Sequence, residues 1–108
     1  THDNETLMQY LECTEEHVRN HIREYMNRPH ASNGELCENL IWMAMSSVGK
    51  YCMIPLQDYL GLGSDARINT PSTLGGNWEW RMKPGEPDEG TVREMERMTK
   101  IYGRLRFT

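Results

Sequence analysis

The stretch that decides the fold runs from Ile54 to Arg81 and reads IPLQDYLGLGSDARINTPSTLGGNWEWR. It begins at the end of a short apolar run, YCMIP at residues 51–55. Such a run is typical of a buried parallel strand, where alternation is lost because both faces are covered. Residues 64–90 carry glycines and prolines without a clear period, and a long irregular segment in a compact domain is usually functional or disordered. Trp78 and Trp80 argue against disorder, so we expect a functional loop.

Three segments around this stretch repeat apolar residues mostly at steps of three and four, the pattern of an amphipathic helix. They predict helices near residues 5–27, 34–48 and 91–105. The apolar positions are Leu7, Leu11, Val18, Ile22 and Tyr25 or Met26 in the first segment, Leu36, Leu40, Ile41, Ala44, Met45 and Val48 in the second, and Val92, Met95, Met98, Tyr102 and Leu105 in the third. The order helix, helix, strand, long loop, helix is typical of an alternating α/β fold.

Capping residues and helix breakers mark the expected helix ends. Pro29 ends the first helix, because the residue before a proline disfavours helical geometry. Gly49 is a natural stop for the second. The candidate N-caps are Asn4 or Thr6, Ser32 or Asn33, and Thr91, which forms a Thr-x-x-Glu capping-box pattern with Glu94.

Length and charge exclude several classes of protein. The chain has 108 residues and a formal charge of -4 without a long basic block, so no nucleic-acid partner is expected. The longest apolar run, residues 40–45, is far too short to span a bilayer, and no signal peptide is visible. We therefore expect a cytoplasmic protein without a membrane partner. A complete eight-stranded α/β barrel takes about 250 residues, more than this chain has.

The cysteines and histidines do not predict a metal site. Cys13, Cys37 and Cys52 are far apart and contain no CxxC pair, so we expect free, mostly buried thiols. His17 and His21 lie one helical turn apart, a spacing that can bind zinc, but no third ligand accompanies them. A solvated helix face is the better interpretation.

Two motifs resemble the end of the catalytic barrel in the amylomaltase family, the 4-α-glucanotransferases or disproportionating enzymes. One is the opening THDN at residues 1–4, and the other is the stretch from Ile54 to Arg81, about fifty residues later. Two motifs in the family's order are far more specific than either alone. The resemblance implies that residues 1–108 are one carboxyl-terminal segment of a TIM (β/α)8 barrel, from the end of strand seven through the last helix. This α/β piece should be mainly α-helical with one or two short strands.

The resemblance also implies an activity. Family members transfer α-1,4-glucan segments, or maltodextrins, to an acceptor sugar by a retaining double displacement, and no metal or organic cofactor is needed. The nucleophile and the proton donor of that family lie earlier in the barrel. We therefore expect the rest of the parent barrel to be the partner of this segment, and the isolated chain to be inactive.

Four residues acquire substrate roles from the resemblance. Asp3 matches the third catalytic carboxylate, which holds sugar hydroxyls and favours the oxocarbenium-like transition state. His2 matches a histidine that hydrogen-bonds the same sugar. Asn69, in the Asn-Thr-Pro element, matches a residue that lines the donor sugar subsite, and Pro71 would shape that loop.

Five further residues have weaker assignments. Gln57 and Asp58 follow the expected strand directly, which allows a substrate role at the strand end. Asp58 equally suits a cap on the following turn. Trp78 and Trp80 are expected to pack the top of the barrel, and Arg81 is expected to pair with a carboxylate.

Two alternatives belong to other functional classes. A small helical binding or interaction module fits the short length and the amphipathic helices. Another glycoside hydrolase of the α-amylase clan fits the His-Asp element, but the Asn-Thr-Pro and Asn-Trp-Glu-Trp-Arg elements favour the glucanotransferase.

Overall fold

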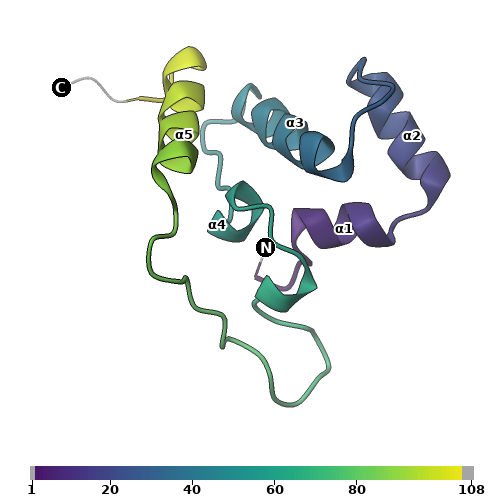
Figure 1. Cartoon of the computed structure of the whole chain (residues 1–108), viewed down its shortest axis with the longest axis vertical. Coiled ribbons are helices and arrows are strands. Elements are labelled where there is room, and N and C mark those ends of the chain that lie inside the picture. The colour runs from purple at the N-terminus through teal and green to yellow at the C-terminus, as the bar shows by residue number, and fades with distance from the viewer. Residues whose placement is uncertain (1, 106–108) are drawn as a thin grey trace.

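A computed structural model describes residues 2–105 as an array of helices in which a long irregular segment precedes the last helix (Figure 1). The elements are α1 (Leu7–Cys13), α2 (Glu16–Tyr25), α3 (Asn33–Met45), α4 (Leu56–Tyr59), the 3-10 helix η1 (Ser64–Ala66) and α5 (Glu89–Ile101). The mainly helical character predicted from the sequence is confirmed. No helix of the described part is long and apolar enough to cross a membrane.

Helix α3 lies at the centre and contributes to both small hydrophobic cores (Figure 1). The first core joins it to α1 and the second joins it to α5. The buried members are Leu11, Ala31, Leu36 and Cys37 in the first core, and Ile41, Met45 and Met98 in the second. These positions include five of the predicted apolar positions, so the periodicity identified much of the core.

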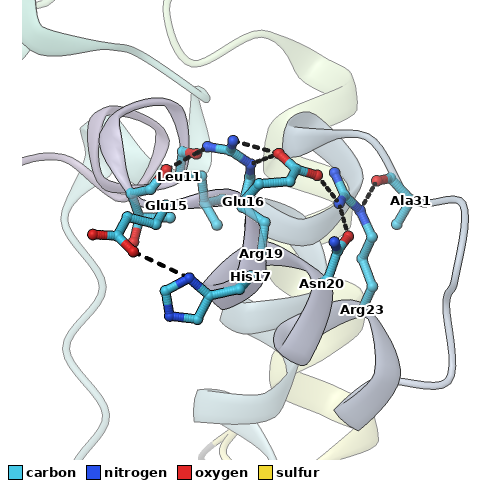
Figure 2. Close-up of polar contacts among 9 residues, drawn as sticks. Leu11, Glu15, Glu16, His17, Arg19, Asn20, Arg23 and Ala31 are labelled. Carbon is cyan, nitrogen blue, oxygen red and sulfur yellow. Dashed lines mark hydrogen bonds and ion pairs between the residues drawn. The ribbon is translucent and has the colours of Figure 1, made fainter.

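The predicted helix 5–27 is wrong in its continuity, because it is two helices that turn at Thr14 and Glu15. Both residues have extended backbones, with ψ of 160° and 150°. The guanidinium of Arg19 stabilises the break, since its Nη1 donates to the carbonyl oxygens of Leu11 and Thr14, each at 2.8 Å (Figure 2). These bonds satisfy carbonyl groups at the end of α1 that have lost their helical donors.

Arg23 also binds a backbone carbonyl group, together with the Glu16 carboxylate. Its Nε donates to the carbonyl of Ala31 at 2.9 Å, and its Nη1 donates to Glu16 at 3.0 Å (Figure 2). Hydrogen bonds from Arg19 and Arg23 lower the pKa of Glu16. Only 17% and 18% of the two arginine side chains are exposed. Both arginines therefore pair with Glu16 and also bind backbone carbonyl groups.

The caps of the later helices follow the sequence signals in part. Ser32 caps α3 in a capping box with Glu35, as expected for one of its two candidates. The cap of α5 is Asp88, whose carboxylate accepts from the Thr91 N–H at 2.7 Å, so the predicted capping box at Thr91 is wrong. Helix α5 ends at Ile101, before the predicted residue 105, because Gly103 adopts a left-handed φ of 65°.

The run at 51–55 is not a strand, and no strand occurs among residues 2–105. Tyr51 and Met53 are 80% and 89% exposed, whereas Cys52 and Ile54 pack on the second core. A strand needs backbone partners beside it, and no other extended segment of the described residues provides them. The run is therefore extended, with one face covered.

The three cysteines are free. Cys37 is buried, Cys52 is half-buried and Cys13 is exposed, so the expectation of mostly buried thiols holds only in part. Burial, with the nearby charges of Asp58 and Glu38, raises the pKa of the Cys37 thiol to about 11.

Candidate functional site

A cavity of about 870 Å³ opens where the start of the chain meets the segments before and after α4. It is lined by residues 2–7 and Tyr10, by residues 53–55 with Gln57 and Asp58, and by residues 66–68. Four residues with predicted site roles, His2, Asp3, Gln57 and Asp58, therefore lie in one place. The other two, Asn69 and Pro71, belong to the loop that leaves the cavity wall.

The carboxylate of Asp3 is the meeting point of the predicted sugar-binding residues. Asn69 Nδ2 donates to Asp3 Oδ1 at 2.7 Å, and His2 Nε2 lies 3.2 Å from the same oxygen. Both contacts orient the carboxylate, and the second oxygen, Oδ2, has no protein partner within residues 2–105. The side chains of His2 and Asp3 are 56% and 52% exposed, so a ligand can reach them.

Arg67 ties the same residues together through the backbone. Its Nη2 donates to the carbonyl oxygen of Asp3 at 2.7 Å, and its Nε donates to the carbonyl oxygen of Asn69 at 3.0 Å. Arg67 follows η1 directly and lines the cavity. Sequence reasoning assigned it no role, because contacts with backbone carbonyls depend on no particular partner residue.

The loop at 69–77 is held together by the Asn77 side chain. Its Oδ1 accepts from the Thr70 N–H at 2.8 Å, and its Nδ2 donates to the Thr73 hydroxyl at 3.0 Å. The Trp78 N–H donates to the Ile68 carbonyl at 2.7 Å and closes the base of the loop. Pro71 lies exposed in this loop, so its shaping role stays a prediction.

Trp78 lies against His2 at the edge of the site. The two ring centroids are 5.1 Å apart, and Trp78 remains 56% exposed. Its φ of 62° is unusual for a bulky residue, and such backbone strain clusters at functional sites. Trp80 is half-buried, and the packing role predicted for both tryptophans stays a prediction. Arg81 forms no ion pair within the described residues; it donates to the Trp78 and Trp80 carbonyls at 3.2 and 2.9 Å, and its predicted carboxylate partner stays a prediction.

Gln57 and Asp58 support the cavity wall. Gln57 is buried and donates from Nε2 to the Ala66 carbonyl at 3.2 Å, which holds η1 beneath the site. Asp58 Oδ1 accepts from the Leu7 N–H at 2.8 Å, so it satisfies the first N–H of α1 from a distant part of the chain and does not cap its own turn. The N-cap of α1 is Thr6, one of its two predicted candidates. Burial raises the pKa of Asp58, and the Leu7 hydrogen bond opposes this rise.

Two substitutions of Asp58 distinguish the contribution of its hydrogen bond to stability from the contribution of its charge. Because the folded-state pKa is raised, the contribution of Asp58 to stability is complete below its ordinary pKa and is lost as pH rises through the folded value. Asp58→Asn keeps an oxygen for Leu7 and removes the charge, so its stability relative to wild type should rise from about pH 4 to about pH 7. Asp58→Ala should cost about 1 kcal/mol, since the acceptor of the Leu7 N–H is lost. Urea unfolding at both pH values measures the free energy of unfolding of each variant. If the stability of Asp58→Asn relative to wild type falls as the pH rises, the prediction is contradicted.

The described residues contain no group of three or more His, Cys, Asp or Glu side chains that could hold a metal. His17 Nδ1 lies 3.1 Å from Glu15, and both side chains are more than three-quarters exposed. This surface pair matches the solvated helix face predicted for His17.

Comparison with known proteins gives a consistent result. The family model described as 4-alpha-glucanotransferase matches residues 1–87. The 4-alpha-glucanotransferase of Solanum tuberosum, named as chloroplastic/amyloplastic, is 35% identical over 97% of this chain and 18% of its own length. The Synechocystis 4-alpha-glucanotransferase is 36% identical over 96% of this chain and 20% of its length.

A solved structure agrees with these relatives. The amylomaltase from Streptococcus agalactiae in complex with acarbose superposes with a TM-score of 0.88 and 30% identity, covering 98% of this chain and 21% of that one. This chain thus spans about a fifth of the length of each of these proteins. Since the family model covers most of the chain and the helices follow the amylomaltase arrangement, this chain belongs to the 4-alpha-glucanotransferase family.

Proposed function

We propose that this chain is the carboxyl-terminal part of the catalytic barrel of a 4-α-glucanotransferase. The whole protein would transfer α-1,4-glucan segments to an acceptor sugar by a retaining double displacement. One observation carries the proposal: Asp3 and Asn69, separated by 66 residues, are joined at 2.7 Å beside a cavity of about 870 Å³. Polar groups that converge on a cavity from distant segments are typical of a binding site.

The proposed roles follow from the geometry around Asp3. In retaining transfer, a nucleophile forms a glycosyl-enzyme and a second carboxyl group protonates the leaving oxygen. Asp3 would be a third carboxylate, whose Oδ2, without a partner within residues 2–105, would accept a hydrogen bond from a sugar hydroxyl that strengthens as positive charge develops on the ring. His2 and Asn69 would fix the direction of that carboxylate and contact the same sugar. The bound acarbose of the related amylomaltase supports a maltodextrin-like ligand.

The extended run at 51–55 supports a barrel origin. One face of the run is covered by the second core, and the other face, with Tyr51 and Met53, is exposed. Neighbouring strands could therefore pair with its backbone and pack against its exposed side chains. We propose that this run is the eighth strand of the whole barrel and that its neighbouring strands come from the rest of the parent protein. The active-site loops would then lie at its carboxyl end, where the cavity opens. A cytoplasmic location stays a prediction, because the Solanum tuberosum relative is named as plastidic.

The direct test is disproportionation by the full-length protein. Maltotriose should give glucose together with longer maltodextrins, and the new bonds should keep the α configuration, because the sugar passes through two displacements. Chromatography measures the products, and proton NMR of the early products measures their configuration. Hydrolysis without longer products, or inversion at the anomeric carbon, would contradict the proposal.

A further inference from the structure

Among residues 2–105, Arg67 is the one residue whose side chain donates to the backbone carbonyls of both Asp3 and Asn69, the partners in the Asp3–Asn69 hydrogen bond. Its two donor groups, Nη2 and Nε, reach the carbonyls of Asp3 and Asn69 at 2.7 and 3.0 Å. Asn69 then returns to Asp3 through its side chain at 2.7 Å. The three residues form a closed ring of hydrogen bonds between the start of the chain and the loop after η1.

We propose that Arg67 is a positioning residue that sets the direction of the Asp3 carboxylate; this role rests on the proposed function. A guanidinium is planar and its N–H groups form a rigid fork, so two carbonyls bound by one guanidinium have little freedom to move relative to each other. The side chain of Asn69 fixes one carboxylate oxygen, while Arg67 fixes the backbones from which both side chains start. The Asn69 contact alone would let the two backbones move relative to each other, and the Arg67 contacts alone would let the Asp3 carboxylate rotate about its side-chain bonds.

The place of Arg67 in the chain strengthens this role. It precedes Ile68, whose carbonyl accepts from the Trp78 N–H at 2.7 Å and closes the base of the 69–77 loop. Arg67 therefore connects the entire loop, with Asn69 in it, to the segment that carries Asp3. Arg67 takes part in no ion pair within residues 2–105. Its hydrogen bonds are made to neutral backbone carbonyls, so they do not neutralise the charge of the Asp3 carboxylate.

Small displacements are costly at such a site. A shift of about 1 Å in a positioned group can cost about 100-fold in rate. Because Asp3 acts mainly on the transition state, loss of Arg67 should lower kcat more than it raises KM. A residue that only stabilises the fold would lower the melting temperature and leave kcat of the folded fraction unchanged.

The test compares Arg67→Ala, Arg67→Lys and Arg104→Lys in the full-length enzyme with maltotriose. Arg67→Ala should lower kcat by about 10- to 100-fold with KM within about 3-fold, and Lys, which lacks the planar fork, should restore little of it. Arg104 is the matched control, because it also donates to backbone carbonyls, those of Met45, Ser47 and Gly49, but away from the cavity. Arg104→Lys should change stability without changing kcat.

The second readout is the double variant with Asp3→Asn. If Arg67 acts through Asp3, adding Arg67→Ala to Asp3→Asn should lower kcat by less than about 3-fold more. Equal losses in both backgrounds, or a normal kcat in Arg67→Ala, would overturn the positioning role. If Arg67→Ala fails to fold, the Lys variant gives the same comparison. A wild-type enzyme that lacks transfer activity would overturn the proposed function, and this role with it, so the two failures are distinguished by the wild-type assay.

Discussion

Asp3→Asn in the full-length enzyme is expected to lower kcat for maltotriose disproportionation by at least ~100-fold, the scale of removing one transition-state contact. Asparagine keeps an oxygen that can accept from Asn69, so the local structure should persist. It loses the negative charge that favours the oxocarbenium-like ring. KM should change less than kcat, because the lost interaction strengthens mainly in the transition state.

Glu5→Gln is the matched control for this result. Glu5 is a second carboxylate on the wall of the same cavity, and its replacement removes the same charge with a similar change of shape. It should leave kcat within about 3-fold of wild type, which excludes a general effect of cavity charge. Near-normal turnover of Asp3→Asn, or equal losses in both variants, would show that Asp3 is not the stabilising carboxylate.

The helices show which parts of the fold are readable from the sequence. Local signals placed the start of α3 and its Ser32 cap, since a capping box acts within four residues. The predicted end was wrong, because α3 ends at Met45, before residue 48 and the expected stop at Gly49, and Val48 is exposed. The break between α1 and α2 was invisible because the apolar stripe continues through Thr14, whereas the break depends on where the Arg19 guanidinium points. Asp58 likewise accepts from the Leu7 N–H, 51 residues away, which no local pattern records. Both the break between α1 and α2 and the Asp58–Leu7 hydrogen bond depend on contacts that the local sequence pattern does not encode.

Some residues of the candidate site could be predicted from the sequence, and others could not. The resemblance supplied His2, Asp3 and Asn69, and the structure brings these three together. Composition and periodicity alone would not have paired residues so far apart. Arg67 escaped prediction because it recognises carbonyl groups, which every residue has. The expected strand at 51–55 failed for a related reason, since strand formation depends on neighbouring segments.

The 108-residue chain by itself is expected to show no glucanotransferase activity. Retaining transfer needs two carboxyl groups about 5–5.5 Å apart across the scissile bond, as nucleophile and acid/base. The cavity is lined by three carboxylates of the described residues, Asp3, Glu5 and Asp58. Asp58 accepts from the Leu7 N–H, and Asp3 accepts from Asn69, with a proposed role as transition-state stabiliser. In the proposed assignment, none of the three is the nucleophile or the proton donor.

Solvent access gives a second reason for this expectation. The side chains of His2 and Asp3 are more than half exposed, so water can reach a bound sugar and compete with an acceptor hydroxyl. The assay incubates the purified chain with maltotriose and follows glucose and longer maltodextrins, with the full-length enzyme as positive control. The Asp3→Asn chain is run beside it, because contaminating host enzyme would give the same product with both chains. Product that forms with the wild-type chain and disappears with Asp3→Asn would mean that these residues hold a complete catalytic site, and the assignment of Asp3 as a third carboxylate would then be wrong.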